Sequence, residues 1–297
     1  MRTKVIGVVL AVLAASSIAH AQAQVDVFAS VVDGAGASVA TVQPDDLRLL
    51  EDGAALKVVK IEAVSGWPTK LQVLLDNGIG LGGENLIHLR NGLRNLLAAL
   101  PAGVEVTVVT TAPQPRMLLR ATTDRTAFMK SPELLAPDSG TGRFVDGLKE
   151  ALQRVEKDKS NHFPMIVSLA TAAGDGNFLD RDVKQIQQRI VARPVTVHAA
   201  VISLPGRTGS QGVIQGELGI WATKVTGGRF ETIAAVSRVA TLLEEYGVAV
   251  ADSHKKQSTQ FRITAERANA AAAVGGISAS TRPGLQLTGL SFDGRHP

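Results

Sequence analysis

The strongest constraint on the fold is an alternation of apolar runs and amphipathic segments along the middle of the chain. Residues 71–75 form a near-continuous apolar run, as in a strand that is covered on both faces. Residues 85–100 follow, with leucines at helical spacing and a Pro-Ala-Gly stop directly after them. Because crossovers between parallel strands are right-handed, this order predicts an α/β fold with a mostly parallel sheet flanked by helices.

The same alternation continues as far as residue 246. We expect further strands at residues 104–110, 116–121, 165–170 and 195–202, and further helices at residues 144–157, 182–192, 218–225 and 234–246. The segment 116–121 follows a Pro-Gln-Pro turn, so we expect it to form an antiparallel hairpin at the edge of the sheet.

The two ends of the chain have a different pattern. Three N-terminal runs, 25–32, 47–51 and 57–64, are strand-like and separated by turns rich in Asp and Gly, which favours local antiparallel hairpins. Residues 260–265 and 277–286 are also expected to be strands. We hypothesise that the two ends pair in a small β unit from which the α/β domain is inserted. The expected organisation is a signal peptide at 1–21, an N-terminal β segment at 24–66, the α/β domain at 67–255 and a C-terminal β segment at 256–292.

Residues 1–21 have the pattern of a secretory signal peptide. Arg2 and Lys4 precede an apolar run, and Ala-His-Ala at 19–21 fits a cleavage site. The alternative, an uncleaved membrane anchor, is disfavoured because the run is shorter than the roughly 20 residues that span a bilayer. The chain has no cysteine, which excludes disulfide bonds, thiolate metal sites and a lipid-modified cysteine. We expect an exported protein, periplasmic or secreted, with no transmembrane segment after removal of the signal.

Cofactor and catalytic motifs are weak in this chain. Gly78, Gly80 and Gly83 match the G-x-G-x-x-G pattern of dinucleotide-binding loops, but Asp76 would place a negative charge beside the pyrophosphate. The simpler interpretation is a tight turn that lets the following helix pack closely. No G-x-S-x-G elbow is present, and no two histidines have the spacing of metal ligands; His198 is expected to be a packed or hydrogen-bonded strand residue. We predict no catalytic residue and no cofactor.

Six passages, taken in their order along the chain, carry a resemblance to a known family. They are the strand, D-x-x-G turn and E-D-G stretch of residues 31–53, LQVLLDNGIG at 71–80, the strand, hairpin and helix start of 104–128, FVDGL at 144–148, ATKVTGG at 222–228 and TRPGL at 281–285. In this order they resemble a von Willebrand factor A (VWA) domain, and more narrowly the exported bacterial VWFA-related proteins. The resemblance implies a Rossmann-like α/β fold and a function in binding.

The resemblance also implies a metal-ion-dependent adhesion site, in which two Asp carboxylates, two Ser hydroxyls and a Thr hydroxyl surround Mg²⁺. Asp76 takes the place of the first Asp. The two Ser positions fall on Gly78 and Gly80, which have no side-chain oxygen.

The two remaining positions differ from the family pattern as well. The Thr position falls on Gly142, with Thr141 beside it. The second Asp falls on a segment whose nearest polar residue is Thr171, with Asp175 a few residues beyond. Because Mg²⁺ requires octahedral oxygen geometry, these losses predict a degenerate site without metal. The alternative is a rebuilt Ca²⁺ or Mg²⁺ site that uses Asp76, Thr141 and Asp175, since Ca²⁺ accepts more varied ligands.

We therefore expect an exported, non-catalytic binding module of VWA type that engages a protein or cell-envelope partner without metal. The charge balance of 31 basic against 27 acidic residues, with 4% aromatics, disfavours a nucleic-acid partner. The alternatives are a metal-dependent adhesion protein with a rebuilt site, and an envelope hydrolase or oxidoreductase. The expected binding face lies at the carboxyl ends of the parallel strands, where α/β proteins bind ligands. It comprises Asp76, Asn77, Gly78, Gly80, Thr141 and Thr171.

Overall fold

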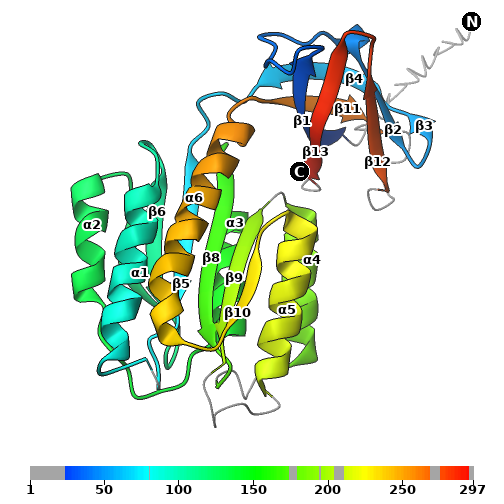
Figure 1. Cartoon of the computed structure of the whole chain (residues 1–297). Helices are drawn as coiled ribbons and strands as arrows, with labels where there is room; N and C mark the ends of the chain where they lie inside the picture. Colours follow the sequence, from blue (N-terminus) through cyan, green and yellow to red (C-terminus); the bar gives the residue numbers. More distant parts are fainter. Residues whose placement is uncertain are drawn as a thin grey trace, which may run out of the picture.

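A computed structural model describes residues 24–79, 81–173, 179–193, 195–203, 211–267 and 275–293. Figure 1 shows two parts: an α/β domain, and a smaller β unit that lies at one end of it and holds strands from both ends of the chain. Among the described helices, none has the length and apolar character needed to cross a membrane.

The α/β domain is built on one central sheet of six strands. In spatial order these are β10 (Phe230–Ile233), β9 (Thr196–Ile202), β8 (Phe163–Thr171), β5 (Thr69–Leu75), β6 (Glu105–Thr110) and β7 (Arg116–Thr122). All neighbours are parallel except β7, which pairs antiparallel with β6. The expected mostly parallel sheet with an antiparallel edge hairpin is therefore confirmed.

Helices cover both faces of this sheet. One face carries α1 (Asn85–Ala99), α2 (Arg125–Leu134) and α6 (Val239–Gln257), and the other carries α3 (Phe144–Lys157), α4 (Asp180–Ala192) and α5 (Gln211–Thr226). Every residue of β8 is buried, as expected of a central strand that is covered on both sides.

The β unit confirms that the two chain ends pair with each other. One sheet has the order β13 (Leu285–Asp293), β1 (Gln24–Asp33), β11 (Gln260–Glu266) and β4 (Lys57–Ala63), and the other has the order β12 (Ile277–Thr281), β2 (Leu47–Glu51) and β3 (Ala54–Ala55). The expectation of local hairpins is wrong for β1, which pairs antiparallel with the C-terminal strands β11 and β13. These pairings bury the apolar residues of β1, including Val25, Val27 and Val31, in a core shared by both ends of the chain.

Two other sequence expectations are corrected. The single strand expected at 277–286 is two strands in different sheets, β12 and β13, because the chain turns between them at Gly284, where φ is +88°. The short strand β10 was not foreseen, and the helix expected at 234–246 begins only at Val239, after a 3₁₀ turn at Val236–Arg238. Only Ile233 of the four residues of β10 is buried, so the sequence has no alternation of apolar and polar residues that would predict this strand.

Trp67 joins the two parts of the molecule. Its ring centroid lies 5.8 Å from that of Phe28 in β1 and 5.6 Å from that of Phe163 in β8. The guanidinium of Arg262 in β11 lies over the same ring, 5.2 Å from its centroid. The β unit is therefore packed against the amino ends of the parallel strands.

Helices α1 and α6 approach closely because each has a glycine that faces the other helix. A Cβ at Gly247 in α6 would lie 2.6 Å from the carbonyl oxygen of Leu96 in α1. A Cβ at Gly92 in α1 would lie 2.9 Å from the carbonyl oxygen of Val239 in α6. The contact of the two helices is therefore a backbone approach that admits no added methyl group at these positions.

We expect Gly247→Ala to lower the free energy of unfolding by about 1–3 kcal/mol, because the added methyl group overpacks the α1–α6 contact. The matched control is Gly216→Ala in α5, where an added Cβ meets nothing within 4 Å. That change should raise stability by up to about 1 kcal/mol, since alanine favours the helix. Urea unfolding of the three proteins measures both effects; a Gly247→Ala protein as stable as the parent would contradict this packing.

Candidate functional site

Asp76 is the centre of the candidate site, at the carboxyl end of β5. Its Oδ1 accepts a hydrogen bond of 2.8 Å from the backbone N–H of Gly78. Its Oδ2 accepts two from Thr171 at the end of β8, 3.0 Å from the backbone nitrogen and 2.5 Å from the hydroxyl. The neighbouring strands β5 and β8 are parallel, so their ends bring these residues together across 95 positions of sequence.

The loop before α3 closes over the Asp76 carboxylate. A Cβ at Gly142 would lie only 2.2 Å from Asp76 Oδ2, and a Cβ at Gly78 would lie 2.3 Å from the carbonyl oxygen of Gly140. Glycine is therefore required at both positions for the backbone to come this near. A threonine at position 142, as the family pattern has, does not fit this arrangement.

Asn77 ties three segments together beneath this edge. Its Oδ1 accepts from the N–H of Ala112 at 3.2 Å, and its Nδ2 donates to the carbonyl of Ala136 at 2.8 Å. Its own carbonyl accepts from the N–H of Asp138 at 2.8 Å. In the sequence, Asn77 is assigned to this face only by its position after the strand, and no local signal indicates its hydrogen bonds to Ala112 and Ala136.

Asp76 is only 1% exposed, and this burial has the largest effect on the pKa of its carboxyl. Loss of hydration raises the pKa of the carboxyl, and the hydrogen bonds from Thr171 and Gly78 act in the opposite direction. No basic side chain of the described residues forms an ion pair with it. The carboxylate is held by donors of its own chain.

The predicted site residues divide into three groups. The structure brings Asp76, Asn77, Gly78 and Thr171 together in a buried cluster. Thr141 is exposed beside this cluster, and Gly80 and Asp175 lie outside the described residues. Asp76 makes a turn by accepting from the N–H of Gly78, and the residue at the start of α1 is Glu84.

The residues present do not fit the metal site of the family pattern. Both oxygens of the Asp76 carboxylate are engaged by protein donors, and Gly78 and Gly142 contribute no side-chain oxygen. In the part of the chain that the structure describes, no group of three or more His, Asp or Glu residues could hold a metal ion. A Mg²⁺ ion would require these internal hydrogen bonds to be replaced.

Comparison with known proteins decides the fold. No family model matches the sequence, and no curated protein is significantly similar to it. A solved structure titled von Willebrand factor type A from Catenulispora acidiphila has a TM-score of 0.51 at 10% identity, covering 92% of this chain and 74% of that one. This chain has the fold of a VWA domain. The VWA fold implied by the sequence motifs is thereby confirmed.

A second structural neighbour is the pilus adhesin SpaC from Lactobacillus rhamnosus GG, in its open conformation. The TM-score is 0.50 at 11% identity, over 74% of this chain and 36% of the adhesin. This chain therefore spans little more than a third of the length of that protein. At sequence identities this low, the structural similarity shows the shared fold alone. Function must be argued from the site.

We expect Thr171→Val to lower the free energy of unfolding by about 1–3 kcal/mol, because it removes a hydroxyl donor from a buried carboxylate. The matched control is Thr111→Val, on a residue that is 3% exposed and whose side chain makes no hydrogen bond within the described residues. That substitution should change stability by less than about 0.5 kcal/mol. Equal effects of the two changes, measured by chemical unfolding, would show that the hydroxyl of Thr171 does not support the carboxylate.

His198 in β9 is a buried, hydrogen-bonded strand residue, as predicted. It is 2% exposed, and its Nδ1 accepts from the N–H of Arg229 at 3.1 Å. Its ring packs beside that of Tyr246, with 5.5 Å between the centroids. Burial, with a smaller effect of the Arg229 charge, lowers the pKa of His198 to about 4.

This shift predicts a loss of stability in acid. Below pH 6.5 the unfolded chain protonates His198, whereas the folded chain keeps it neutral down to about pH 4. Protonation of the unfolded state therefore costs the folded state up to about 3 kcal/mol as the pH falls from 6.5 to 4. Thermal unfolding against pH should show a shallower decline for His198→Asn than for the parent. Parallel curves for the two proteins would contradict a neutral buried imidazole.

Proposed function

We propose that this protein is an exported, non-catalytic VWA module that binds a protein or cell-envelope partner at the carboxyl edge of its central sheet, without a metal ion. The observation that carries the proposal is the sealed carboxylate of Asp76. In this VWA fold, the one carboxylate retained at the family's metal position is turned inward and bonded to Gly78 and Thr171.

Burial of the same group supports binding over catalysis. A catalytic acid, base or nucleophile must reach its substrate, but Asp76 and Thr171 are 1% and 2% exposed. The Asp76 carboxyl accepts hydrogen bonds from Thr171 and Gly78, which gives it a structural role. SpaC, to which this chain is similar in fold, is itself a pilus adhesin.

Exposed apolar side chains at this edge support a protein partner. Ile79 is 42% exposed and Leu179 is 50% exposed, on the loop after β5 and directly before α4. Their backbones are held by hydrogen bonds, from Ile79 N to the carbonyl of Gly140 at 2.9 Å and from Leu179 N to a carboxylate oxygen of Asp182 at 3.2 Å. Rigid exposed apolar groups favour contact with another protein surface.

Export remains part of the proposal. It depends on the signal pattern of residues 1–21, which lie outside the described residues. The proposed location is the periplasm or the medium, and both place the binding edge within reach of envelope proteins. Fractionation of cells that express the full chain tests this part separately.

Site-specific photo-crosslinking tests the binding edge. A photoreactive amino acid at Ile79 should give a discrete crosslinked product in the native envelope. The same group at Val191, which is 56% exposed at the opposite end of α4, is the matched control and should not. The product at position 79 should persist when EDTA is present, because the proposed contact needs no metal. Identical products from both positions would refute the binding edge, and a product lost in EDTA would refute metal independence.

Calorimetry tests the alternative metal-dependent module. If Asp76, Thr141 and Asp175 rebuild a site, Ca²⁺ or Mg²⁺ should bind with micromolar affinity, and Asp76→Ala should abolish the binding. We expect no heat of binding from either cation, because protein donors already occupy the oxygens of Asp76. Saturable binding that Asp76→Ala removes would favour the alternative.

A further inference from the structure

Helix α5 differs in composition from the other helices on the same face of the sheet. It has two charged residues among 16, whereas α3 has six among 14 and α4 has five among 13. A helix at the surface of a protein has a polar face toward water, and a helix that is apolar all round is typically buried on every side. The composition of α5 therefore indicates that its outer side is covered by another surface.

Within the described chain, only the inner side of α5 is covered. Leu218 and Ala222 are 3% and 0% exposed and pack in the core between the helices and the sheet, at the end of the sheet where β9 and β10 lie (Figure 1). In contrast, Ile220 and Val225 are 52% and 49% exposed. A Cβ at Gly216 would meet nothing within 4 Å, so no other described segment covers α5 there.

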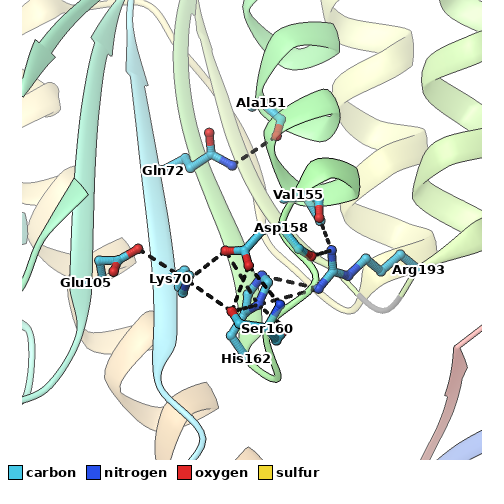
Figure 2. A network of polar contacts seen from close by, with 9 residues as sticks. All are labelled: Lys70, Gln72, Glu105, Ala151, Val155, Asp158, Ser160, His162 and Arg193. Atoms are coloured by element: carbon cyan, nitrogen blue, oxygen red, sulfur yellow. Dashed lines mark hydrogen bonds and ion pairs between the residues drawn. The ribbon is translucent and has the colours of Figure 1, made fainter. Parts of the chain in front are cut away.

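The two charges of α5 are also left without partners. Beside α3, on the same face of the sheet, charges are paired within the chain: Lys70 Nζ donates to Asp158 at 2.6 Å and lies 3.8 Å from Glu105, as Figure 2 shows. Glu217 and Lys224 are exposed, and their side chains form no hydrogen bond or ion pair among the described residues. Both charges are therefore available to a second molecule.

Glu217, Ile220 and Lys224 lie on one face of α5. Their spacing of three and four residues places them in a row along the helix, with the apolar side chain between two opposite charges. A row of this kind is complementary to itself when two copies run antiparallel, because each glutamate then faces a lysine. Two copies in parallel would bring like charges together, which disfavours that arrangement.

We propose that α5 is the interface of a homodimer, in which it packs antiparallel against α5 of a second copy about a twofold axis beside Ile220. Glu217 precedes Ile220 by three residues, and Lys224 follows it by four. Each Glu217 therefore comes within one residue's rise, about 1.5 Å along the helix, of the partner's Lys224. The two copies use the same surface, so the contact closes as a dimer. This surface is separate from the binding edge at Asp76 and does not depend on the function proposed for it.

Sedimentation equilibrium of the purified protein tests the dimer. One helix from each copy buries less than the roughly 1,600 Å² of a standard interface, so we expect a weak, reversible dimer that forms between micromolar and millimolar protein. A protein that stays monomeric throughout this range would overturn the proposal.

Charge exchange makes the test specific. Glu217→Lys and Lys224→Glu should each weaken association about tenfold, because each places like charges opposite one another at two points of the interface. The variant with both changes has the same net charge as the parent and should recover the parent's dissociation constant. Both side chains are exposed and unpaired within the described chain, so the variants should unfold at the same urea concentration as the parent. A double variant that is as weak as the single variants would overturn the proposal.

Cysteine crosslinking tests the position of the axis. The chain has no cysteine, so one introduced thiol reports on one position. Ile220→Cys should form a disulfide-linked dimer on mild oxidation, since the same residue of both copies meets beside the twofold axis. The matched control is Val248→Cys in α6, at a residue that is 50% exposed, and it should stay monomeric at the same concentration. Equal rates of disulfide formation at the two positions would overturn the proposed axis.

Discussion

The hydrogen bonds that hold the buried carboxylate of Asp76 organise the carboxyl edge of this VWA fold. A carboxyl group on a residue that is 1% exposed needs hydrogen-bond donors, and here they come from Thr171 and Gly78. The approach of the loop over that carboxylate then requires glycine at position 142. An edge that could have offered open oxygen ligands is instead closed by its own backbone.

The two edges of the sheet differ in how far their buried polar groups are hydrogen-bonded. At the carboxyl edge the carboxylate is fully bonded within the chain. At the amino edge, one guanidinium group comes from Arg154 in α3 and another from Arg193, the residue directly after α4. Arg193 is held by carbonyl oxygens, whereas Arg154 retains a buried donor without a partner among the described residues.

The β unit and the α/β domain are held together through both chain connections. Strand β4 leads through Trp67 into β5, and α6 leads directly into β11, so the domain enters and leaves the β unit on adjacent strands. Trp67 packs edge-on against Phe28 and tilted against Phe163, which places an apolar contact where the chain passes from one part to the other. Two chain connections and one aromatic cluster therefore link the two parts.

Local pattern in the sequence determined the elements, and tertiary structure decided their partners. Leucine spacing predicted α1 to within a residue, and the apolar runs predicted β5, β8 and β9, because periodicity reports which side of a segment is buried. The position of Asp76 could be predicted from its motif. Its bond to Thr171 could not, since the two residues are 95 positions apart and meet only when β5 and β8 pair in register. For the same reason, the sequence does not predict that β1 pairs with C-terminal strands. It also does not predict that Arg154 Nη2 is buried without a partner among the described residues. Burial and pairing over long separations depend on the whole packed chain, which no local window contains.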